Sequence, residues 1–129
     1  MLRITIQTTD EATGKELAIP DTLRTQVQHV ADYLAGNLQK LGKNFEIEAQ
    51  IRVLEQPANK FVVFLDLLGR HGAIKSHPIP EQALNNDVDL HRDLHRPLWD
   101  FCDILAIEVD LILERLRASR EEFATASEK

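Results

Sequence analysis

The run His91-Arg92-Asp93-Leu94-His95 is the part of this sequence in which residue types and spacing come nearest to a reactive site. Two histidines four positions apart share one face of a helix, which is how helices present paired ligands to a zinc ion. No glutamate stands where a general base would be needed, and no third ligand is evident unless His71 or His77 folds across. His91 and His95 are therefore weak candidates for a metal site, and the alternative is an ordinary helix start. We predict no metal and no cofactor.

Other signs of catalysis are missing from the sequence. It contains no GxSxG, P-loop or CxxC motif. The single cysteine, Cys102, falls on an apolar helical stripe, so we expect a buried thiol and not a nucleophile. We predict that the protein is not an enzyme and has no small-molecule substrate.

Positive charge gathers in two clusters. The first consists of Arg70, His71, Lys75 and His77, and the second of His91, Arg92, His95 and Arg96. If the clusters converge, they form one patch suited to phosphate groups, which arginine binds with two parallel hydrogen bonds. The alternative is a mixed surface, in which Asp87, Asp89, Asp93 and Asp100 neutralise the second cluster. Because the net charge is −6, nucleic-acid binding would have to rest on such a local patch.

The elements that must position these side chains follow from hydrophobic periodicity. Alternation predicts strands over 2–7, 46–53, 61–68 and 73–77. The 3.6-residue period predicts helices over 21–42 and from Pro97 to about Arg120, with a short helix near residue 87. Pro97 either kinks this short helix or occupies the first turn of the main helix. The predicted fold is α+β, in the order β-α-β-β-β-α, with one mostly antiparallel four-stranded sheet and two long helices on one face. We expect a single domain over 1–120 and a frayed tail over 121–129.

The last helix carries two apolar lines. The line expected to be core along its whole length consists of Leu98, Phe101, Cys102, Leu105, Val109, Ile112 and Leu116. The second line consists of Ile104, Ile107 and Leu111, among acidic residues on the opposite side. Since a second surface must cover it, these three residues are candidates for a homodimer or protein-partner interface.

This layout resembles the family of ribosome hibernation-promoting factors and ribosome-associated translation inhibitors. The likeness runs through Ile4-Thr5-Ile6, Ile19-Pro20-Asp21-Thr22-Leu23, Leu38-Gln39-Lys40-Leu41, the strand over 61–68 and the helix over 98–116. The resemblance implies the predicted fold and binding to the small ribosomal subunit, or its rRNA, in the channel of mRNA and tRNA. With the local clusters, it gives as candidate RNA-binding residues Lys40, Lys43, Arg70, Lys75, Arg92, Arg96 and Arg115.

Two functions from different classes remain open on this basis. One is a ribosome-binding factor of translation regulation that acts by phosphate contacts and steric exclusion. The other is an acidic interaction module that homodimerises or docks a partner through the second apolar line. No apolar run of about 18 residues and no signal-peptide pattern occurs, so we expect a cytoplasmic protein without a membrane partner.

Overall fold

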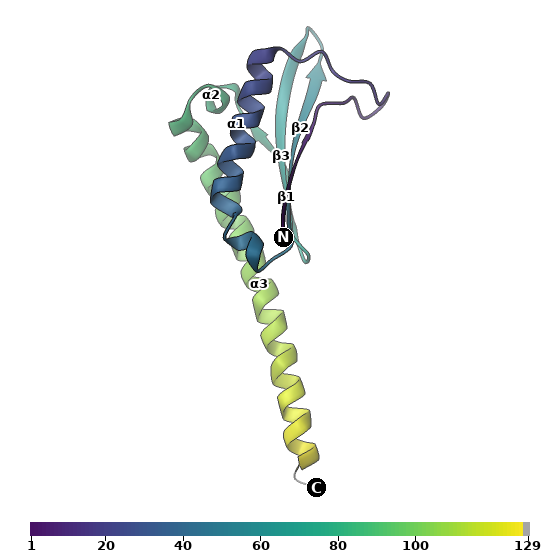
Figure 1. Cartoon of the computed structure of the whole chain (residues 1–129), viewed down its shortest axis with the longest axis vertical. Helices are drawn as coiled ribbons and strands as arrows, with labels where there is room; N and C mark the ends of the chain where they lie inside the picture. The colour runs from purple at the N-terminus through teal and green to yellow at the C-terminus, as the bar shows by residue number, and fades with distance from the viewer. Residues whose placement is uncertain (128–129) are drawn as a thin grey trace.

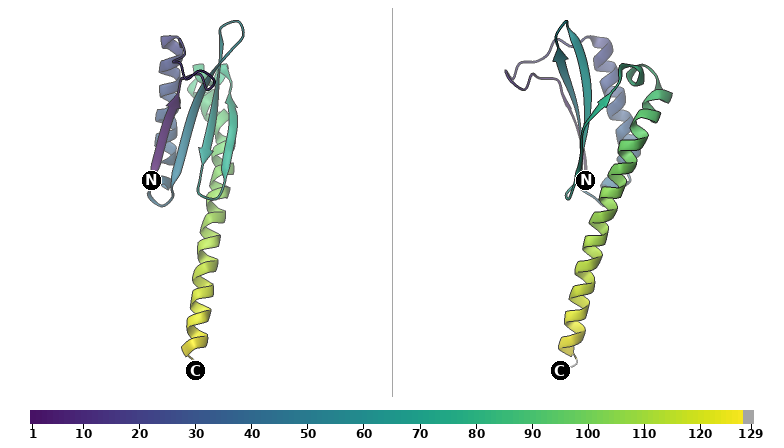
Figure 2. Two further views of the ribbon diagram at one scale, coloured as in Figure 1. Left: turned by 90° about the vertical axis from the view of Figure 1, so that its right-hand side faces the viewer. Right: turned by 180° about the vertical axis from the view of Figure 1, so that it is seen from behind.

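The computed structural model describes the backbone of residues 1–127 and the side-chain surroundings of residues 1–120. Four strands form one sheet in the order β1-β2-β3-β4: β1 (Leu2–Gln7), β2 (Ile47–Gln56), β3 (Lys60–Leu68) and β4 (Ala73–Ile79). Strand β1 runs parallel to β2, and the other neighbours are antiparallel. The helices α1 (Asp21–Leu38) and α3 (Asp87–Ser127) both lie on one face of this sheet (Figure 2). The predicted α+β fold is confirmed.

Strand alternation decides which side chains meet the helices. In β2, Ile47, Ala49, Ile51 and Val53 are buried, while the residues between them are partly exposed. The buried set points toward α1 and α3, because side chains of a strand alternate between the two faces. Helix α1 contacts β1 and β2, and α3 contacts β4 and the short helix α2 (Glu81–Asn85). The core is the layer between these helices and the sheet.

The open face of the sheet holds one buried charge network. Asp66 is buried, and its carboxylate accepts hydrogen bonds from Arg52 Nε at 2.7 Å and from the Ser76 backbone N–H at 2.7 Å. Ser76 has a φ of 56° and lies where the pairing of β3 with β4 is irregular. The Arg52 guanidinium also lies 5.7 Å from the centre of the Phe64 ring. This network joins β2, β3 and β4, so its evident role is structural.

Helix α3 differs from the prediction in its extent. It begins at Asp87, so the expected short helix and the expected main helix are one, with Pro97 inside it. It also continues past Arg120 to Ser127, far beyond the sheet and α1 (Figure 1). Residues 128–129 lie outside the described residues, and fraying of the 121–129 segment stays a prediction. We call residues 106–127, which follow the last buried apolar residue Leu105, the projecting segment.

The helices do not have the character of membrane spans. In the part of the chain that the structure describes, none of them is both long enough and apolar enough to cross a bilayer.

Candidate functional site

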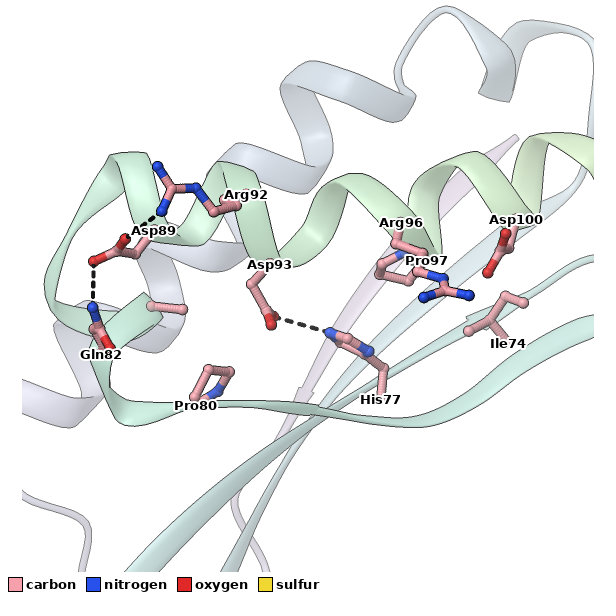
Figure 3. A pocket seen from close by; sticks show the side chains of 11 residues that line it. Ile74, His77, Pro80, Gln82, Asp89, Arg92, Asp93, Arg96, Pro97 and Asp100 are labelled. Atoms are coloured by element: carbon pink, nitrogen blue, oxygen red, sulfur yellow. Dashed lines mark hydrogen bonds and ion pairs between the residues drawn. The ribbon is translucent and has the colours of Figure 1, made fainter.

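The structure brings part of the two predicted cationic clusters together. Arg92 and Arg96 of α3 and His77 of β4 line one cavity of about 670 Å³ between this strand and this helix (Figure 3). Asp89, Asp93 and Asp100 line the same cavity. Asp93 Oδ2 is 2.9 Å from His77 Nε2, and Asp89 Oδ1 is 4.0 Å from Arg92 Nη1. Two arginines therefore share the cavity with three carboxylates, which favours the mixed-charge alternative over a single phosphate-binding patch.

The remaining candidate cations lie elsewhere. Lys40 and Lys43 follow the end of α1, at the short 3-10 helix η1 (Leu41–Lys43), and Arg70 lies in the turn between β3 and β4. We call the sheet, α1, α2 and the first part of α3, up to Leu105, the body. Both segments lie at the end of the body from which α3 projects (Figures 1 and 2). Lys75 is exposed on β4, and Arg115 is exposed on the projecting segment. Within the described residues, none of these five side chains forms an ion pair within 4.0 Å.

His91 and His95 lie in a different place from Arg92 and Arg96, the arginines that directly follow them in sequence. His91 Nδ1 is 2.6 Å from the Tyr33 hydroxyl of α1, and the rings of His91 and His95 have centroids 6.2 Å apart. Burial raises the pKa of the Tyr33 phenol. Within the described residues, no three histidine, cysteine or acidic side chains are grouped as ligands of a metal ion. The pair therefore shares a helix face as predicted, and among the described residues no third ligand joins it.

A groove of about 210 Å³ lies between α1 and α3, next to these histidines. Leu38, Leu41, Leu98 and Cys102 are among its lining residues, together with Trp99, which is largely exposed. The prediction of a buried Cys102 is wrong, because this side chain is exposed at the outer edge of the helix pair. The groove still shields part of the thiol from water, and this partial desolvation, followed by the carboxylate of Asp103, raises the pKa of Cys102. A thiol held in its protonated form is a poor nucleophile, which gives no support to catalysis at this position.

The projecting segment departs most from the prediction. The line Leu98, Phe101, Leu105 is buried or half-buried, but its continuation is not: Val109 is 40% exposed, Ile112 50% and Leu116 60%. The prediction that this line is core along its whole length is wrong, because the body ends near Glu108, the last buried residue among the described side chains. A sequence period identifies an apolar face but does not tell whether the same chain covers it.

The second apolar line is divided by the same boundary. Ile104 is half-buried and packs against Gly72, where an added Cβ would lie 2.8 Å from Ile104 Cγ2. Ile107 is 56% exposed and Leu111 40% exposed. Ile104 is thus used within its own chain, and Ile107 and Leu111 remain available. The spacing of Val109, Ile112 and Leu116 identifies an apolar helix face in the sequence, but no signal in the sequence shows that this face is exposed.

Comparison with known proteins adds no further assignment. Searches of protein-family models, of curated proteins and of solved structures find no match to this chain. The resemblance to ribosome hibernation-promoting factors stays a prediction, and the geometry of the chain itself carries the functional argument.

Proposed function

We propose that the protein is a non-enzymatic interaction module that docks an apolar helix of a protein partner along its projecting segment. The observation that carries this proposal is the exposure of Ile107, Val109, Leu111, Ile112, Leu113 and Leu116 on one short stretch of helix. Val109, Ile112, Leu113 and Leu116 lie on one side of the helix, and Ile107 and Leu111 lie on the other. Exposed apolar side chains gathered on one side of a helix are typical of interaction sites. The globular body serves to hold the first half of α3 and to present the second half.

The helix itself supports the same conclusion. Most helical stability in proteins comes from the packing of an apolar face and not from the intrinsic propensity of the chain. Beyond Glu108 every described side chain of α3 is exposed, so the body contributes little packing there. A partner helix that covers the apolar positions would supply the missing burial, worth roughly 25 cal/mol for each Å² of apolar surface.

Site-specific photo-crosslinking in cell extract tests this function, because the reaction captures a bound partner of any sequence. We expect a photoreactive p-benzoylphenylalanine at Ile112 to form protein adducts, because this position lies on the proposed docking face. The matched control is the same residue at Val88, which is 65% exposed near the start of α3. Equal or absent adduct formation at the two positions would count against a docking surface on the projecting segment.

RNA binding is the second candidate, and one observation favours it. Lys40, Lys43 and Arg70 lie at the same end of the body, and none of them pairs with a carboxylate in the described chain. The fold also agrees with the one that the family resemblance implies. Three cations held at one end offer phosphate contacts on a chain whose overall charge is negative.

Co-sedimentation with small ribosomal subunits at increasing salt tests this candidate. Phosphate contacts predict a steep loss of binding between low and physiological salt, and Lys40→Glu with Arg70→Glu should abolish it. Arg92→Glu is the matched control, because this arginine lies beside Asp89. Binding that ignores salt, or that is lost equally in the control, would remove the RNA proposal.

A further inference from the structure

We propose that the cavity between β4 and α3 binds a small zwitterion, namely an α-amino acid with an apolar side chain. This inference is independent of the partner proposed for the projecting segment, because the cavity lies at the first half of α3. It concerns binding and involves no reaction. Two features of the cavity support it: a pair of opposite charges that have no partners, and an apolar lining beside them.

Most charged side chains of this cavity are already paired with one another. His77 Nε2 lies 2.9 Å from Asp93 Oδ2. The Asp89 carboxylate accepts a hydrogen bond from Gln82 Nε2 at 3.1 Å and lies 4.0 Å from Arg92 Nη1. These groups satisfy each other, so they leave little unbalanced charge for a ligand.

Arg96 and Asp100 are the two charges of the cavity that remain. Among the residues that the structure describes, no ion pair within 4.0 Å involves either of them. Both side chains extend from α3 toward Ile74 of β4 (Figure 3). The guanidinium and the carboxylate thus face the same space without meeting across it.

The sequence around these two residues explains why they stay unpaired. Asp93, three positions before Arg96, is a neighbour of this arginine on the helix surface, but His77 engages its carboxylate. Arg96 and Asp100 are four positions apart with the cation first, and this order is the less favourable one for an ion pair on a helix. The positions three and four residues after Asp100 are Asp103 and Ile104, so neither supplies a cation.

Two opposite charges in one cavity select the charge of the ligand. Asp100 repels a simple anion such as phosphate, and Arg96 repels a simple cation. A zwitterion avoids both penalties, because its carboxylate binds the Arg96 guanidinium and its ammonium group binds the Asp100 carboxylate. Both contacts are charge-assisted hydrogen bonds, which are the stronger kind.

Apolar side chains form the lining next to these charges. Ile74 and Pro80 line the cavity from β4 and its end, Ala83 from α2 and Pro97 from α3. The volume of about 670 Å³ lies in the range of roughly 300–1,000 Å³ in which proteins bind small molecules. An apolar ligand side chain placed on this lining removes apolar surface from water, which favours binding. The cavity therefore fits an amino acid such as phenylalanine or leucine.

NMR titration of the purified chain with L-phenylalanine tests the inference. We expect saturable binding, with saturation transfer from the protein to the ligand protons. Phenylalaninamide lacks the carboxylate and N-acetylphenylalanine lacks the ammonium group, so each should bind about tenfold more weakly. Absence of phenylalanine binding, or equal affinity for all three compounds, would overturn the inference.

Two variants assign each ligand charge to its residue. Arg96→Gln should weaken phenylalanine binding by about tenfold but should not weaken phenylalaninamide, which has no carboxylate to lose. Asp100→Asn should weaken phenylalanine by a similar factor but should not weaken N-acetylphenylalanine. If either variant weakens the amino acid and its matching derivative equally, that residue does not bind the proposed charge, and the inference is wrong.

Matched controls lie on the same helix outside the cavity. Arg115→Gln and Asp103→Asn make the same two changes at exposed side chains that do not line it. We expect both controls to bind phenylalanine as the wild type does. A loss of affinity in the controls as large as in Arg96→Gln and Asp100→Asn would show an effect of overall charge and overturn the site.

Discussion

Two glycines show how single residues set the packing of this protein. Gly72, in the turn before β4, lies against Ile104 of α3, and a Cβ added there would be 2.8 Å from Ile104 Cγ2. Gly36, within α1, has no atom within 4 Å of an added Cβ. The same substitution therefore has opposite expected effects at the two positions.

We expect Gly72→Ala to lower the free energy of unfolding by about 1–3 kcal/mol, because the new methyl group overpacks the contact between the turn and α3. Gly36→Ala should raise it by up to about 1 kcal/mol, since alanine is the better helix former and meets no obstacle. Urea titration measures both. Adding Ile104→Ala to Gly72→Ala should recover part of the loss, and a loss that persists undiminished would contradict the steric cause.

The thiol of Cys102 permits a chemical test at the same scale. Its pKa is raised by partial desolvation in the groove and by the Asp103 carboxylate, so at pH 8 less thiolate is present than in a free cysteine. We expect iodoacetamide to alkylate the folded chain more slowly than a cysteine peptide. Asp103→Asn should accelerate the reaction by less than about tenfold, because only the smaller of the two causes is removed. Asp110→Asn, farther along α3, serves as the control and should leave the rate unchanged.

At the scale of elements, the sequence predicts the order and type of the long elements because period and burial agree in them. From Ile47 to Val53 of β2, every second residue is apolar and buried, so alternation and structure coincide. In α1, Val27, Val30, Leu34 and Leu38 follow the helical period and are buried on one side. The predicted elements are wrong mainly where a local residue preference competes with the hydrophobic period. Pro97 is an example, because proline disfavours a helix interior and yet lies inside α3.

The extent of the body along α3 could not be predicted by the same reasoning. Leu105 and Ile112 are both apolar and lie on the same side of the helix, seven residues apart. Leu105 is buried, whereas Ile112 is half exposed. The difference arises because the sheet and α1 end between these two positions, and that end is set by strand lengths and turns far away in sequence. The candidate RNA-binding site could not be predicted for the same reason. Arg92 and Arg96 share their cavity with three carboxylates, and Lys40 and Lys43 lie at another place on the body.

This boundary predicts the result of a truncation. A chain that ends after Asp110 should lose no more than about 1 kcal/mol of unfolding free energy, measured by urea titration at concentrations where the full chain is monomeric. The reason is that all described side chains from Val109 onward are exposed and add few contacts to the body. Loss of a cooperative unfolding transition in the shortened chain would mean that the projecting segment is part of the body.

At the scale of the whole molecule, charge and shape point to different partners. The net charge of −6 disfavours a polyanion overall, and the cavity that holds Arg92 and Arg96 also holds three carboxylates. The shape combines a small body with a long apolar helix that extends out of it (Figure 1). A helix so exposed gains more from burial than from any single phosphate contact. For this reason the interaction module ranks above RNA binding as the proposed function.

If two copies of the chain associate through the projecting segment, the thermal stability of the whole molecule depends on concentration. Mass action favours the folded dimer as the protein becomes more concentrated, and a tenfold increase contributes about 0.7 kcal/mol to each chain. For a domain of this size the Tm should therefore rise by about 2 °C for each tenfold increase, measured by scanning calorimetry above the dissociation constant. Ile112→Glu should abolish this dependence while Ile107→Glu retains it. A wild-type Tm that stays constant over a hundredfold range would show that the projecting segment does not join two copies.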